Sequence, residues 1–160
     1  MVDGAWTYGG VDCSDGTTTT CESSCPYPFT DCGSGAITGS WCEDFDGEVF
    51  PPEGWISYRG ANGLGEGYDW EASSTYAVSG ANSAHVRYEN VDGGLAEDWL
   101  VTPMFVPDAS NNHISFSHRQ AYTSDYGATY DVRVSTSSND SYDDFTVLAS
   151  WTEADFEAGE

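Results

Sequence analysis

The sequence contains no lysine and only four arginines, against 27 aspartates and glutamates, so its formal net charge is −23. A nucleic-acid-binding surface needs clustered basic side chains to contact phosphates, and this composition does not supply them. The same charge disfavours an anionic membrane surface as a partner. The acids instead favour divalent cations, or a salty medium in which charge repulsion is screened within about 10 Å. We therefore expect an acidic protein with no nucleic-acid partner.

Long hydrophobic runs are also missing. No stretch reaches the roughly 18 apolar residues of a membrane-spanning helix, so we expect no membrane insertion. The apolar runs are short and are separated by Gly, Ser, Asn and Asp, a pattern typical of β-strands joined by turns. Aromatic residues make up 14% of the chain, which is too many for a disordered segment. A length of 160 residues suits one ordinary domain with an appendage.

Cysteine is absent after residue 42, and all five cysteines precede that point: Cys13, Cys21, Cys25, Cys32 and Cys42. This change in composition predicts a Cys-rich segment over residues 1–42 and a separate domain over 43–160. The first segment is too poor in apolar residues to bury its own core, so we expect disulfides and an oxidising, extracellular compartment. The odd count leaves one thiol free or paired with another chain. Zinc is an alternative, although Cys21 and Cys25 lack a second closely spaced pair.

The stretch 41–55 gathers acids around Gly47, with Asp44, Asp46 and Glu48 at alternate positions. Ca²⁺ takes six to eight oxygen ligands from flexible loops, so these three carboxylates are candidate calcium ligands. The spacing is not that of an EF-hand. The alternative is that the acids face water and only improve solubility.

The chain after residue 43 predicts a series of short strands, at 55–58, 70–73, 84–88, 99–105, 114–119, 130–135 and 145–151. In one of them Tyr130, Val132 and Val134 alternate with polar residues, which indicates a strand with one buried face. The run 99–105 is almost continuously apolar and predicts a strand that is buried on both faces or crosses an end of the sandwich. Such spacing favours an all-β fold, an antiparallel β-sandwich of the jelly-roll type.

A set of motifs in a fixed order resembles the cleaved-adhesin or choice-of-anchor J domain, over residues 43–155. The motifs are Phe45-Asp46, Pro52-Glu53-Gly54-Trp55, Ser79-Gly80-Ala81-Asn82-Ser83, Asp98-Trp99-Leu100-Val101-Thr102-Pro103, Ile114-Ser115-Phe116 and Tyr130-Asp131-Val132-Arg133-Val134-Ser135-Thr136-Ser137. The resemblance implies a galactose-binding-like or MAM-like jelly roll with structural calcium. It places the turn at Asn82 near the acids, so Asn82 is a fourth candidate residue of the calcium site. It also implies a non-catalytic role in adhesion or substrate targeting.

Members of that family continue through further strands, so we expect this chain to lack its last strands. Either the chain is a fragment of a longer one, or a neighbouring copy donates a strand to the open edge.

Catalytic motifs are absent, since the chain has neither a nucleophile elbow nor a metalloprotease helix, and we expect no catalytic residues. Candidate ligand-binding residues are Trp70, Tyr122 and Tyr126, whose rings lie in or beside polar loops. The alternative is that these rings cover the ends of the sandwich. His118 falls on the apolar side of its strand, as a core histidine does.

The sequence therefore predicts a secreted or surface-displayed cell-adhesion module, stabilised by calcium and disulfides, that attaches to an extracellular glycan or protein. One alternative is a structural subunit of an extracellular filament or matrix, in which strand donation or the Cys-rich arm links further copies. Another is a targeting module of a secreted hydrolase.

Overall fold

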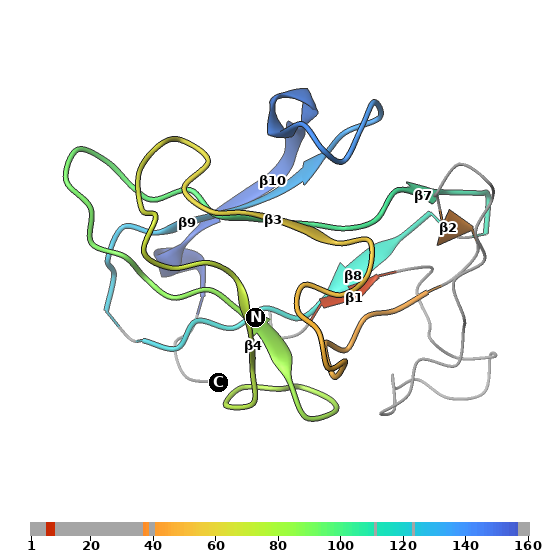
Figure 1. The fold of residues 1–160 in the computed structure, drawn as a ribbon, viewed down its shortest axis with the longest axis horizontal. Helices are drawn as coiled ribbons and strands as arrows, with labels where there is room; N and C mark the ends of the chain where they lie inside the picture. Colours follow the sequence, from red (N-terminus) through yellow and green to blue (C-terminus); the bar gives the residue numbers. More distant parts are fainter. Residues whose placement is uncertain (1–5, 9–36, 39–40, 111, 123, 157–160) are drawn as a thin grey trace.

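The computed structural model describes residues 6–8, 37–38, 41–110, 112–122 and 124–156 (Figure 1). Its strands are β1 (Trp6–Tyr8), β2 (Ile37–Thr38), β3 (Ile56–Tyr58), β4 (Glu71–Ser73), β5 (Ser83–His85), β6 (Trp99–Val101), β7 (Phe105–Val106), β8 (Ile114–Phe116), β9 (Thr129–Val134) and β10 (Thr146–Thr152). Two short 3₁₀ helices, η1 (Tyr142–Asp144) and η2 (Glu153–Asp155), are the helical elements of these ranges. The strand-rich class predicted from the sequence is confirmed.

The strands of the described ranges pair into five two-stranded sheets, and none of these sheets closes on itself. β1 pairs with β8, β3 with β6, β4 with β5 and β9 with β10, all antiparallel, whereas β2 and β7 are parallel. Neither described helix has the length or the apolar character needed to traverse a bilayer. These strand pairs do not by themselves define a jelly-roll sandwich, which stays a prediction.

The predicted continuous strand 99–105 is wrong, because the structure divides it into β6 and β7. Pro103 lies between them and has no N–H to donate to a neighbouring strand. The break lets the two halves take different partners, with Val101 opposite Ile56 and Phe105 opposite Ile37.

The predicted alternation of buried and exposed side chains along 145–151 is wrong at Val147. The pairing of β10 with β9 shifts between Val147 and Ala149, so Leu148 is an extra residue in the ladder. One extra residue turns the following side chains to the opposite face. Val147, expected to be buried, is 51% exposed and Leu148 is 62% exposed.

The core is an aromatic cluster around Phe45, which is only 1% exposed. Its ring lies 5.3 Å from that of Trp55, and the rings of Trp41 and Trp55 are 6.1 Å apart. Ile37 completes the buried cluster. Ile37 and Trp41 precede the predicted boundary at residue 42, and β1 and β2 pair with strands that follow it. The two predicted segments therefore share a core and strand pairs.

Candidate binding site

The acidic stretch lies against the turn at residues 80–82, as the resemblance implies. The carboxylate of Asp46 accepts hydrogen bonds from the backbone N–H of Ala81, at 2.8 and 3.0 Å, and from that of Asn82, at 2.7 Å. A Cβ on Gly80 would lie 2.3 Å from Asp46 Oδ2, and Gly80 has a φ of +66°. Glycine at this position therefore lets the turn approach the carboxylate.

The neighbouring acids hold the local backbone. Asp44 accepts the N–H of Asp46 at 3.0 Å, and Glu43 accepts the N–H of Phe45 at 2.8 Å. Burial raises the pKa of the Glu43 carboxyl, and the nearby charges of Asp44 and Asp46 raise it further. The side chain of Glu48 is exposed.

Calcium takes six to eight oxygen ligands, and the carboxylate of Asp46 is one oxygen-bearing group of this stretch. Both of its carboxylate oxygens accept hydrogen bonds from peptide N–H groups, one of them that of Asn82. Among the residues that the structure describes, no group of three or more His, Cys, Asp or Glu side chains could hold a metal ion. The described residues form a capped turn at Asp46, and calcium at this stretch stays a prediction.

The predicted disulfides fall mostly outside the described residues. Cys13, Cys21, Cys25 and Cys32 all lie there, and Cys42 is buried beside the core. The pairing stays a prediction.

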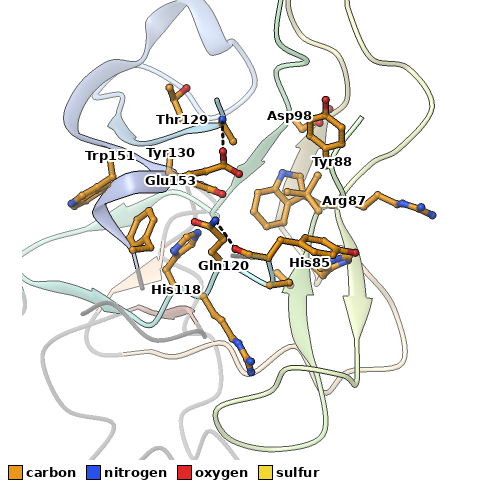
Figure 2. A pocket seen from close by; sticks show the side chains of 18 of the residues that line it. His85, Arg87, Tyr88, Asp98, His118, Gln120, Thr129, Tyr130, Trp151 and Glu153 are labelled. Atoms are coloured by element: carbon orange, nitrogen blue, oxygen red, sulfur yellow. Dashed lines mark hydrogen bonds between the residues drawn. The ribbon is translucent and has the colours of Figure 1, made fainter. Parts of the chain in front are cut away.

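A pocket of about 840 Å³ lies between three parts of the fold: the β4–β5 pair, the segment that follows β8, and the β9–β10 pair (Figure 2). Small-molecule sites typically measure 300–1,000 Å³. All three ligand-binding candidates from the sequence, Trp70, Tyr122 and Tyr126, line this pocket. The structure therefore brings together residues that the sequence separates by about fifty positions.

A tyrosine cluster, Tyr88, Tyr122 and Tyr126, lines the exposed part of the pocket. The ring of Tyr126 lies 5.5 Å from that of Tyr88 and 6.3 Å from that of Tyr122. All three side chains are at least half exposed. Sequence reasoning missed Tyr88, because its only distinguishing feature in the sequence is that it ends the predicted strand 84–88.

Glu153 fixes the loop that carries Tyr126. Its carboxylate is buried and accepts the backbone N–H groups of Tyr126 and, at 3.1 Å, Ala128. The N–H of Glu153 donates in return to the carbonyl of Ala128 at 3.3 Å. Burial raises the pKa of the neighbouring Tyr130 to about 12, and the charge of Glu153 adds to this shift. Sequence reasoning missed Glu153, because one acid among 27 carries no signal.

The inner wall of the pocket carries His118 and Gln120 (Figure 2). The imidazole of His118 packs against the rings of Tyr130, at 4.6 Å, and Phe156, at 4.4 Å. Burial lowers the pKa of His118 to about 4, so the ring is neutral at neutral pH. Gln120 is 7% exposed, and its Nε2 donates to the carbonyl of Tyr122 at 2.7 Å.

The carboxylates that line the pocket are engaged by the protein itself. Glu89 accepts the N–H groups of Gly67 and Tyr68, and Asp98 accepts that of Gly60 at 2.9 Å. The other three acids of the lining also have partners. An oxygen of Glu71 lies 3.3 Å from Nδ1 of His85, and Asp131 accepts a hydrogen bond from Arg133. Glu153 accepts the backbone N–H groups described above.

Two of the four arginines also line the pocket, and both stack on tyrosines. The guanidinium of Arg87 lies 4.4 Å from the ring centre of Tyr68, and that of Arg119 lies 4.4 Å from the ring centre of Tyr76. The charged side chains of the walls are therefore arranged by contacts within the protein.

Comparisons of this chain with protein-family models, with curated proteins and with solved structures give no match. The likeness to adhesin domains accordingly rests on the motifs in the sequence.

Proposed function

We propose that this protein is a non-catalytic extracellular binding module that attaches to a glycan or protein partner through the tyrosine cluster and the pocket beside it. The observation that carries the proposal is the cluster itself, in which the ring of Tyr126 lies beside those of Tyr88 and Tyr122. All three rings are at least half exposed and line a pocket of about 840 Å³. Tyrosine rings supply a large apolar face and a polar hydroxyl, and they are enriched in binding surfaces.

We also propose that the strands belong to a jelly roll of the adhesin type, preceded by a disulfide-held arm. The strand-rich architecture supports this, and so does the contact between Asp46 and the turn at Asn82. Calcium in this region stays part of the proposal, with a test set out in the Discussion.

Replacing Tyr122 and Tyr126 together with alanine is expected to weaken attachment to the partner by about tenfold or more, because the contact area of two rings is lost. The measurement is binding of the labelled protein to a glycan array and to immobilised extracellular proteins. The matched control is Tyr142→Ala, a tyrosine that packs on Tyr58 and Trp99 and does not line the pocket. Equal binding by the double variant and the control would contradict the proposed site.

A second candidate function is that of a filament or matrix subunit. β9 and β10 are the longest strands of the described ranges, and there they pair only with each other. An open strand edge is a template for pairing with another chain. Val147 and Leu148 add exposed apolar side chains to β10.

For a filament subunit, sedimentation velocity should show concentration-dependent oligomers, and Leu148→Lys should abolish them, because a lysine on an edge strand opposes strand pairing. The control is Tyr142→Lys, which places the same charge on η1. A wild-type protein that stays monomeric at every concentration would eliminate this candidate.

A further inference from the structure

The tyrosine cluster presents ring faces in more than one direction. The ring planes of Tyr122 and Tyr126 are inclined by 82° to one another, and those of Tyr88 and Tyr126 by 41°. Exposure of these side chains is 66% for Tyr122, 53% for Tyr88 and 50% for Tyr126. The face of an aromatic ring carries partial negative charge and attracts a cation placed over it, and several inclined rings can contact one cation together. The cluster therefore has the geometry of a site for a positively charged group.

The arginines of the chain are engaged at other rings or lie outside the pocket. Both arginines that line the pocket stack on tyrosines outside the cluster. Arg133 stacks on Trp99, with 4.7 Å between the guanidinium carbon and the ring centre, and Arg59 does not line the pocket. The chain contains no lysine. A Lys or Arg side chain over the tyrosine cluster would therefore come from a partner.

Three carboxylates of the pocket walls have neutral partners. Glu89, Asp98 and Glu153 accept hydrogen bonds from peptide N–H groups, which carry no net charge and so do not neutralise a carboxylate. Asp131, by contrast, forms an ion pair with an arginine at 2.7 Å. Figure 2 shows Asp98 on one side of the pocket and Glu153 on the other. The walls beside the cluster thus favour a cation.

The charge of the whole protein selects in the same direction. A net charge of −23 attracts a cationic partner from a distance and repels an anionic one. Among cationic side chains, the guanidinium of arginine is planar, stacks on aromatic faces and is less strongly hydrated than the ammonium of lysine. Tyr68 and Tyr76 of this pocket already bind guanidinium groups in this way, each at 4.4 Å. Arginine therefore matches the cluster better than lysine.

We propose that the tyrosine cluster and the acidic walls beside it bind an arginine side chain in a basic segment of an extracellular protein partner. This inference rests on the proposed function and specifies the partner class of the same site.

The direct test compares two labelled peptides by fluorescence anisotropy, Gly-Arg-Gly-Arg-Gly and the same peptide with citrulline in place of arginine. Citrulline has nearly the same shape but a neutral urea group. We expect the wild type to bind the arginine peptide saturably and about tenfold or more tightly than the citrulline peptide. Added NaCl should weaken this binding, because salt screens exposed charges. Failure of the arginine peptide to bind, or equal binding of the citrulline peptide, would overturn the proposal.

A substitution that keeps the net charge separates the site from the overall charge. Tyr126→Leu removes one ring, so affinity for the arginine peptide should fall about three- to thirtyfold, the range of a cation–π contact. Tyr126→Phe keeps the ring face and should bind within about twofold of the wild type. The matched control is Tyr142→Leu, which lies outside the pocket lining. If Tyr126→Leu binds as well as this control, the overall charge alone holds the peptide and the proposal is wrong.

The wild type decides the question by NMR if a leucine variant does not fold. The arginine peptide should shift the ring signals of Tyr88 and Tyr126 in a saturable manner and leave those of Tyr142 unchanged. Shifts confined to rings outside the pocket would overturn the proposal, and so would the absence of any shift.

Failure of the partner class is distinguishable from failure of the proposed function. If the wild type binds no arginine peptide but the double alanine variant of Tyr122 and Tyr126 loses a partner, only the basic partner class is wrong. If the double variant keeps every partner of the wild type, the proposed function is wrong.

Discussion

Replacing Phe45 with alanine is expected to lower the free energy of unfolding by about 3–5 kcal/mol, the usual cost of removing a buried phenyl ring. Phe45 is the most deeply buried large side chain of the described residues, and its ring contacts those of Phe50 at 5.9 Å and Trp55 at 5.3 Å. For a domain of this size the melting temperature should fall by about 10 °C or more. Thermal unfolding followed by circular dichroism measures the change.

Alanine at this site would not relieve the backbone, because Phe45 has a φ of +60°, a conformation that alanine also adopts with difficulty. The matched control is Val49→Ala, a nearby apolar residue that is 73% exposed; its effect should stay within about 0.5 kcal/mol. A Phe45→Ala protein that melts together with this control would mean that the aromatic cluster does not form the core.

Replacing Asp46 with alanine is expected to cost about 2–3 kcal/mol, since hydrogen bonds to a charged group contribute more than neutral ones and their donors would lose a partner. The carboxylate accepts the N–H groups of Ala81 and Asn82 at distances of 2.7–3.0 Å. These bonds need no metal, so the loss should persist in EGTA. The measurement is chemical unfolding of both proteins in millimolar calcium and in EGTA. Glu48→Ala, an exposed acid of the same stretch, is the control.

The same experiment tests the calcium prediction. A cation that binds the folded state raises stability by mass action, so calcium at this stretch should stabilise the wild type beyond its value in EGTA. Identical wild-type stability in the two media would end the calcium prediction. Full stability of Asp46→Ala in EGTA would show instead that the N–H contacts of the carboxylate contribute nothing.

Gly80→Ala gives an independent check on that contact. The new Cβ would lie 2.3 Å from Asp46 Oδ2, and the φ of +66° disfavours any side chain at this position. The glycine and the aspartate therefore act on one contact, and their substitution effects should not add.

Sequence reasoning located the strands well and their limits less well. The alternation of Tyr130, Val132 and Val134 correctly indicated a strand, because one face of β9 packs inward. It could not detect the bulge at Leu148, since an extra residue in a ladder is a property of two paired strands. Nor did it end β6 before Pro103, because the apolar run continues on both sides of that residue.

The sequence also identified part of the candidate site. The aromatic residues Trp70, Tyr122 and Tyr126 were recognisable from their polar loops, and all three line the pocket. The buried amide of Gln120 and the buried carboxylate of Glu153 were not recognisable, because burial depends on what packs against a residue from elsewhere in the chain.

By itself, the sequence determined the acidic character, the high aromatic content and the strand-rich class of this protein. The first two follow from composition, and the third follows from period-two patterning, which is a property of neighbouring residues. Only the tertiary structure decided that Asp46 caps the turn at Asn82, that the core spans residue 42, and that Trp70, Tyr122 and Tyr126 line one pocket. Each of these features joins residues that are distant in the sequence, and such contacts are set by packing rather than by local preference.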